Sequence, residues 1–228
     1  MRPMILRNIF FPTALFLLAI TINAISELDL RLADYLFALE GGQWSLKNAW
    51  ITKVLIHEQG RALVGVILIS LLSCIVLSYR LEQLRIMRPG LIYILVSALV
   101  SVATVNILKE ITGVDCPWDL SRYGGTQSYV SLLAAPPEGQ EAGACFPSGH
   151  ASGAYCWLGV FFFAGLYLPK WRYRALAVVL GLGLIFGAAQ QLRGAHFLSH
   201  DIWTLYICWM SATLCFFYLF RLPKRSAP

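Results

Sequence analysis

Long apolar runs separated by short polar segments dominate the pattern of hydrophobic and polar positions. A helix needs roughly 20 apolar residues to cross the hydrocarbon core of a bilayer. The pattern therefore predicts an all-α, six-transmembrane-helix bundle, with spans at about 8–26, 61–79, 90–109, 150–168, 174–192 and 202–220. Arg2 and Arg7 precede the first run, as they would in a signal peptide. That run is long and no small-residue cleavage site follows it, so we interpret it as an uncleaved helix.

The segment between the first two spans, residues 27–60, is amphipathic. Leucines alternate with charged residues from Glu27 to Phe37, and a second stretch carries Trp44 and Trp50. Such a composition is typical of the bilayer interface, so we predict an amphipathic interfacial segment in this loop. It either covers the helix ends or guides a lipid headgroup sideways out of the membrane. We interpret His57 with its neighbour Glu58 as a solvated loop pair, and membership of the functional site is the alternative.

The composition supports this membrane interpretation. Hydrophobic residues make up 58% of the 228 residues and charged residues only 13%, against about 25% in a typical soluble domain. A chain of this length holds a single membrane domain, 1–228, with no room for a separate soluble domain. The formal net charge is +6, which is compatible with nucleic-acid binding. The positions of the charges along the chain distinguish nucleic-acid binding from orientation in a membrane.

The basic residues are distributed unevenly between the two sides. With the N-terminus inside, the inner segments hold 11 of the 18 lysines and arginines, whereas Glu82 is the only one of 12 acidic residues there. The positive-inside rule then predicts a multi-pass inner-membrane protein with both termini cytoplasmic. We expect the protein to contact the lipid bilayer and to have no nucleic-acid partner and no obligatory protein partner. Anionic-lipid binding by the inner basic runs is the alternative interpretation.

This orientation brings several ionisable residues to the outer ends of different spans. Ionisable groups beside a bilayer are costly, which makes them candidates for a functional site. Because the hydrophobic pattern does not require them to share one face, their common side indicates one shared site facing the periplasm or exterior. They are Lys109, His150, Arg193, His196, His200 and Asp201.

The residue types at these positions suit the binding of a phosphate group. Ser148 is a good N-cap and Gly149 permits close backbone approach, at the start of a helix whose free N–H groups attract anions. Lys109 and Arg193, with Arg122 in reserve, supply positive charge. Histidine can act as a nucleophile or as a general acid, and two candidates are present.

A metal site is the alternative use of the histidines. His196 and His200 are four residues apart and would share one helix face, with His150 as a third ligand. Lys109 and Arg193 would repel a cation, and no cluster of carboxylates or thiolates offsets them. We therefore expect no metal and no other cofactor.

Two of the six cysteines differ from the others in position. Cys116 and Cys145 lie in the second outer loop, whereas the other four lie in apolar spans, where a small hydrophobic role is usual. An outer compartment permits oxidation, so we predict a disulfide between Cys116 and Cys145. The alternative is two free thiols.

These motifs together resemble the type 2 phosphatidic acid phosphatase family, integral-membrane lipid phosphate phosphatases that share their site with vanadium-dependent haloperoxidases. The family pattern is a lysine, six residues and Arg-Pro; then Pro-Ser-Gly-His; then Ser-Arg, five residues, His, three residues and Asp. Residues 147–150 match fully and His196 matches the third block, so the resemblance covers a phosphatase core at about 61–220. The chain departs from the pattern at Cys116, Gln190 and His200, which stand where the family has arginine, arginine and aspartate.

The resemblance implies a role for each residue of the site. His196 would attack phosphorus to form a phosphohistidine, and His150 would protonate the leaving oxygen. Either His200 or Asp201 would orient His196. The implied ligands of the phosphoryl oxygens are Lys109, Ser148, Gly149 and Arg193, with Arg122 as a stand-in for a missing arginine.

The implied activity is metal-independent removal of phosphate from a lipid phosphate or pyrophosphate at the outer face of the membrane. Family substrates of this kind include phosphatidic acid, phosphatidylglycerol phosphate, undecaprenyl pyrophosphate and lipid A. Two alternatives stay open: a lipid-to-lipid phosphotransferase, and a non-catalytic anionic-lipid binder or transporter. Transporters concentrate polar groups near the middle of their spans, whereas the ionisable residues here gather at one end.

Overall fold

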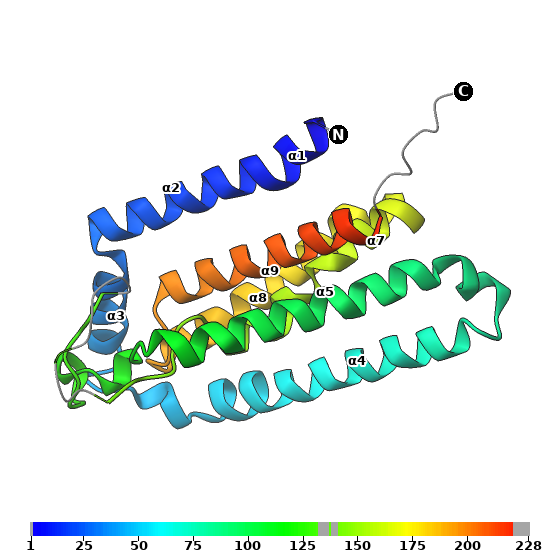
Figure 1. Cartoon of the computed structure of the whole chain (residues 1–228). Helices are drawn as coiled ribbons and strands as arrows, with labels where there is room; N and C mark the ends of the chain where they lie inside the picture. Colours follow the sequence, from blue (N-terminus) through cyan, green and yellow to red (C-terminus); the bar gives the residue numbers. More distant parts are fainter. Residues whose placement is uncertain (1, 132–136, 138–140, 221–228) are drawn as a thin grey trace.

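The computed structural model describes residues 2–131, 137 and 141–220, and each secondary-structure element within them is helical (Figure 1). The predicted all-α fold is therefore confirmed. The α-helices are α1 (Arg2–Ile5), α2 (Phe11–Ser26), α3 (Leu28–Leu39), α4 (Gln59–Leu77), α5 (Glu82–Thr112), α6 (Gly149–Tyr155), α7 (Gly159–Tyr167), α8 (Arg172–Leu192) and α9 (Leu198–Leu219). Shorter 3-10 or π-helical turns are η1 (Leu6–Phe10), η2 (Ser45–Asn48), η3 (Ile51–Glu58), η4 (Pro117–Asp119), η5 (Ser121–Tyr123), η6 (Cys156–Leu158) and η7 (Pro169–Trp171).

Five of the described helical segments are long and apolar enough to cross a membrane, which indicates a multi-pass membrane protein. They are Leu6–Ser26, Ile51–Leu77, Glu82–Asp119, Pro169–Leu192 and Leu198–Leu219. Each overlaps one of the predicted spans. The remaining prediction, 150–168, is helical as α6, η6 and α7, but it is not among the five. His150 and the small and polar residues of its first turns lower its hydropathy.

The long helices lie side by side as a bundle, and α3 lies across one end (Figure 1). α5 contacts α4, α6, α7 and α9, while α2 packs on the outer side of α9. The start of α2 and the end of α9 share one end of the bundle (Figure 1). The Trp209 indole N–H, in the middle of α9, donates to the Asn8 carbonyl in η1 at 2.8 Å. The long loops gather at the opposite end. The basic residues Arg221, Lys224 and Arg225, which entered the charge count, lie outside the described residues.

Close helix packing in the bundle depends on glycines and a few buried polar groups. The Tyr93 hydroxyl is fully buried and donates to the Ala212 carbonyl at 2.9 Å, which ties α5 to α9. A Cβ at Gly159 would lie 2.5 Å from Ser97 Oγ, and one at Gly183 would overlap the Tyr155 ring. Small residues of this kind let helix backbones approach each other within a membrane.

The first outer segment differs from its prediction in one respect. Residues 51–60, predicted as loop, are helical, because η3 runs directly into α4. No glycine or proline interrupts the chain between Trp50 and Gln59, so the apolar stretch continues the helix toward its N-terminus. The preceding helix α3 packs on the outer loops through a small second core. Its buried members are Ala33, Leu120, Tyr123 and Phe197, with Leu30, Phe37 and Trp44 packed against them.

Candidate active site

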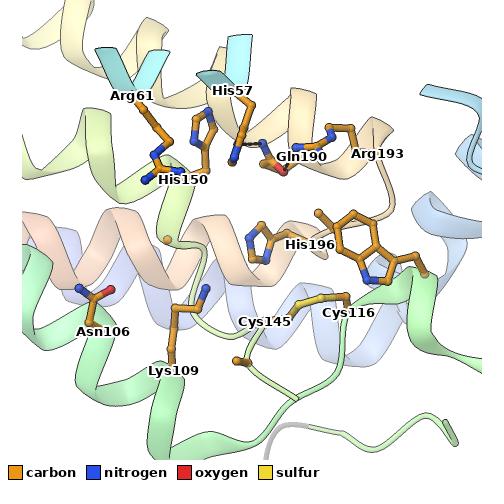
Figure 2. A pocket seen from close by; sticks show the side chains of 14 residues that line it. His57, Arg61, Asn106, Lys109, Cys116, Cys145, His150, Gln190, Arg193 and His196 are labelled. Atoms are coloured by element: carbon orange, nitrogen blue, oxygen red, sulfur yellow. Dashed lines mark hydrogen bonds between the residues drawn. A yellow bond between two sulfur atoms is a disulfide. The ribbon is translucent and has the colours of Figure 1, made fainter. Parts of the chain in front are cut away.

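A cavity of about 650 Å³ opens at the loop end of the bundle (Figure 2). Helices α4, α5, α6 and α8 and the turn between α8 and α9 all contribute to its walls. The residues that line it are His57, Arg61, Asn106, Lys109, Cys116, Trp118, Ala144, Cys145, Gly149, His150, Gln190, Arg193, Ala195 and His196. Five of the predicted site residues are thus brought together in one cavity: Lys109, Gly149, His150, Arg193 and His196.

His196 occupies the α8–α9 turn, which several contacts hold in place. Gly194 has a φ of +68°, and a Cβ there would overlap the Trp44 indole, so only glycine fits this turn without strain. The Gly194 carbonyl accepts a 2.9 Å hydrogen bond from the Trp118 backbone N–H. The turn is therefore clamped between the first and second outer loops, and His196 is fixed at the cavity wall.

The nearest side-chain partner of His196 is His200. Their Nδ1 atoms lie 3.3 Å apart, and both side chains are buried. Burial, followed by the charges of His200 and Lys109, holds the pKa of His196 well below its ordinary value. His196 is therefore a neutral imidazole near pH 7, the form in which a ring nitrogen has a lone pair.

Asp201 faces away from His196. Its Oδ2 accepts a 2.7 Å hydrogen bond from Gln191 Nε2, and a Cβ at Gly187 would lie 2.6 Å from the same oxygen. Asp201 does not line the cavity. A rotation of about 100° per helical residue separates positions 200 and 201, so only one of the two can face His196. The structure places His200 there.

His150 lies on the first turn of α6, between two aromatic rings. The His57 ring centroid is 4.5 Å from that of His150 on one side, and the Phe186 centroid is 4.7 Å away on the other. The Nε2 atom of His150 is buried, and no described residue hydrogen-bonds to it. This atom therefore has no hydrogen-bond partner of its own within the described part of the chain.

Positive charge lines the cavity without a compensating carboxylate. Lys109, Arg61 and Arg193 contribute the cations, and no Asp or Glu is among the described residues that line it. No hydrogen bond or ion pair joins Lys109 or Arg61 to another described residue. A Cβ at Gly149 would lie 3.3 Å from Lys109 Nζ, so glycine leaves room for this ammonium beside α6.

Arg193 is more constrained than the other two cations. Its Nε donates to the Lys47 carbonyl at 2.9 Å and its Nη1 to Gln190 Oε1 at 3.1 Å. Burial lowers its pKa, although a guanidinium keeps its charge at pH 7. Gln190 also donates from Nε2 to His57 Nδ1 at 3.1 Å. An amide thus links Arg193 to His57 along one wall (Figure 2).

Two predicted phosphate ligands do not line the cavity. The Arg122 guanidinium binds both carboxylate oxygens of Asp34, at 2.7 and 2.6 Å, and Tyr123 donates to the same carboxylate at 2.9 Å. These bonds hold the pKa of Asp34 below its usual range and tie the second outer loop to α3. Ser148 is fully buried, and its carbonyl accepts a 3.1 Å hydrogen bond from Thr204 on α9.

His57 and Arg61 both line the cavity. The sequence interpretation gave site membership only as the alternative for His57, and it missed Arg61. The solvated loop pair expected at His57 and Glu58 is wrong for His57, because η3 and α4 form one helical run that carries it inward. His57 and Arg61 are four residues apart and therefore lie on one face of that run. Extending the predicted second span toward the N-terminus would have revealed this shared face.

A disulfide joins Cys116 to Cys145, whose Cα atoms are 5.2 Å apart. Backbone hydrogen bonds run beside it, from Gly143 N to the Gly113 carbonyl at 3.0 Å and from Cys145 N to the Val114 carbonyl at 2.9 Å. The end of α5 and the start of α6 are therefore linked covalently. This link fixes the position of Lys109 relative to His150.

One cluster of potential metal ligands occurs within the described part of the chain, and it coincides with this disulfide. It consists of Cys116, Asp119 and Cys145. A metal would require deprotonated thiols, which sulfurs joined in a disulfide do not supply. The cluster is better explained by the covalent link.

Comparison with known proteins identifies the family of the chain. A family model of the PAP2 superfamily matches residues 90–224, which include Lys109, His150 and His196 but not His57 or Arg61. No curated protein and no solved structure matches the chain. The expected relationship to the type 2 phosphatidic acid phosphatases is confirmed. Because the match extends over more than half of the sequence, the chain belongs to the PAP2 superfamily, a family of phosphatase-type hydrolases.

Proposed function

We propose that the protein is a metal-independent phosphatase that removes phosphate from a lipid phosphate or pyrophosphate through a phosphohistidine. One observation carries the proposal: three histidines, His150 and His196 among them, share a cavity with three cations and no described carboxylate. Such a cavity favours an anion over a metal ion, because nothing in it offsets a bound cation's charge. A phosphoryl group, with charge spread over its oxygens, suits this arrangement.

In the first step, Nε2 of His196 attacks phosphorus. The P–N bond forms as the bond from phosphorus to the leaving oxygen breaks. His150, as an imidazolium stabilised by the bound phosphoryl anion, transfers its proton from Nε2 to that oxygen. In the second step, water attacks phosphorus and the P–N bond breaks. His150 takes up one proton from the water, which restores its imidazolium and the neutral imidazole of His196 and releases phosphate.

The 3.3 Å contact with His200 supports this assignment of nitrogens. If Nδ1–H of His196 donates to Nδ1 of His200, Nε2 of His196 keeps its lone pair for the attack. His200 then performs the orienting role that the family assigns to aspartate. Because His200 is an imidazole, it fixes the tautomer without adding a formal negative charge behind the nucleophile.

A second cavity supports a lipid rather than a soluble substrate. It has a volume of about 190 Å³ and adjoins the first at Arg61, Gly149 and His150. Its remaining walls are mainly apolar and come from Gly60, Val64, Gly153 and Phe186. We infer that the phosphate occupies the larger cavity while the apolar part next to it extends into the smaller one.

The proposal includes six spans, with Gly149–Tyr167 as the sixth, and a site facing the periplasm or exterior. With an even number of spans, the start of α2 and the end of α9 lie on the same side of the membrane. Figure 1 shows these two helix ends at the same end of the bundle. The uneven distribution of basic residues supports the inner side for both termini. We place α3 at the outer membrane interface, where it covers the loop end of the bundle.

Phosphate release from a lipid panel by the purified protein in EDTA tests this function. The panel contains phosphatidic acid, phosphatidylglycerol phosphate, undecaprenyl pyrophosphate and lipid A. We expect release from at least one lipid, inhibition by vanadate, and loss of activity in His196→Ala. Activity that needs added metal, or that persists in His196→Ala, would contradict the mechanism. Transfer to a lipid acceptor without free phosphate would indicate a phosphotransferase, and no reaction with any lipid would indicate a binder or transporter.

A further inference from the structure

Arg61, on the first turn of α4, lies where the two cavities meet. It lines both the larger cavity, with Lys109 and His196, and the smaller apolar one. Figure 2 shows its guanidinium directed toward His150 from the helix that also carries His57. The family match begins at residue 90, so this arginine belongs to a part of the chain that the family model does not cover.

The guanidinium of Arg61 is available for a ligand. Its side chain is exposed, and no hydrogen bond or ion pair joins it to another described residue. The other arginine of the cavity, Arg193, is already bonded through Nε and Nη1 to Lys47 and Gln190. Arg61 therefore offers the fork of N–H donors that can bind two phosphoryl oxygens at once.

The two positions expected to supply arginines to this site do not do so. Cys116 is joined in the disulfide, and Gln190 is an uncharged amide engaged by its neighbours. Arg122, the other candidate, is bound to Asp34 outside the cavity. Among the described residues that line the cavity, the only unbonded arginine is therefore Arg61, on the α4 wall.

We propose that Arg61 is a phosphoryl-binding residue that supplies the bidentate arginine contact otherwise missing from this site. Lys109 binds the phosphoryl group from the α5 wall and Arg61 binds it from the α4 wall. Because Arg61 also borders the apolar cavity, it selects a phosphate that is attached to an apolar group. This inference rests on the proposed function, since it concerns the ligand of the same site.

Vanadate binding to the purified full-length protein, measured by calorimetry, tests Arg61 without requiring turnover. Arg61→Met removes both the forked N–H donors of the guanidinium and its positive charge, whereas Arg61→Lys keeps only the positive charge. Arg31→Met is the matched control, because Arg31 is exposed on α3 and lines neither cavity. Thermal melting verifies that each variant is folded.

Loss of a charged hydrogen-bonding partner predicts that Arg61→Met weakens vanadate binding about 10- to 100-fold. We expect Arg61→Lys to lie between Arg61→Met and the wild type, and Arg31→Met to match the wild type. Equal vanadate affinity in Arg61→Met and Arg31→Met would overturn the inference. If the wild type binds vanadate but releases no phosphate from any lipid, the proposed function fails while the comparison of variants still decides the role of Arg61. A wild type that does not bind vanadate would overturn both.

Discussion

His200 occupies the position where the family has aspartate, and its Nδ1 atom lies 3.3 Å from that of His196. Asp201, one residue further on, faces Gln191 instead. The sequence left both residues open as the group that orients the nucleophile, because motif spacing does not specify how a helix is rotated. The structure separates them, since only residue 200 points back toward the turn that carries His196.

Substitution of these two residues should therefore have unequal effects. We predict that His200→Phe lowers kcat by roughly 10²–10⁴-fold, because His196 loses the partner that fixes its tautomer. Asp201→Asn keeps the shape and the contact with Gln191, so we expect a change below about 10-fold. Steady-state phosphate release by the two variants provides the comparison. A larger loss in Asp201→Asn than in His200→Phe would assign the orienting role to the aspartate.

The lowered pKa of His196 also predicts a pH dependence of stability. In the folded state the pKa of His196 lies well below its ordinary value of 6.5. At a pH between the folded-state pKa and the ordinary one, the unfolded chain therefore binds more protons than the native protein. Stability should fall as the pH drops through this window, by up to about 1.4 kcal/mol per pH unit for one group. When the pH is lowered from 7.5 to 5.5, we expect the melting temperature of His196→Gln to decrease by less than that of the wild type. Equal losses would show that burial does not depress this pKa.

At the scale of elements, the hydrophobic pattern predicted helices better than it predicted their ends. The helical run through α4 begins at Ile51 rather than at residue 61, and that difference hid the shared face of His57 and Arg61. Helix starts are hard to predict in amphipathic stretches, because interfacial residues suit a loop and a helix equally. The close contacts between helices were not predicted either, since they depend on which glycines face a neighbour.

Two glycines on α8 allow a direct test of this packing. A Cβ at Gly183 would overlap the Tyr155 ring on α6, whereas a Cβ at Gly181 meets nothing within 4 Å. We predict that Gly183→Val destabilises the protein by about 1–3 kcal/mol, because the added methyl groups push α8 away from α6. Gly181→Val, the matched control, should be close to neutral. Melting temperatures in detergent decide the matter, and equal melting temperatures would contradict the α6–α8 contact.

At the scale of the whole molecule, the fold gathers residues from distant parts of the chain at one end of a helix bundle. The sequence indicated this arrangement, because Lys109, His150 and His196 all fall at the same end of their predicted spans. It did not indicate how α3 and the outer loops clamp the site. That clamp depends on contacts between segments far apart in sequence, such as Arg122 with Asp34 and Trp44 with Gly194.

The proposed orientation in the membrane can be tested with a pair of cysteine substitutions. Gln43 is exposed after α3 at the loop end, and Gln83 is exposed at the start of α5, at the other end. We predict that a membrane-impermeant maleimide labels Gln43→Cys in intact cells and labels Gln83→Cys only after permeabilisation. The four remaining unpaired cysteines are buried or half-buried, which limits their background labelling. The reverse pattern would place the cavity on the inner side.

The central claim is that His196 carries the phosphoryl group during turnover, and trapping the intermediate tests it most directly. The protein would be mixed with a lipid substrate labelled in its phosphate, quenched in base, digested and analysed by mass spectrometry. We predict an acid-labile phosphohistidine at His196 that forms in EDTA and is absent from His196→Ala. Turnover without a phosphorylated His196, or with the phosphoryl group on another residue, would contradict the account.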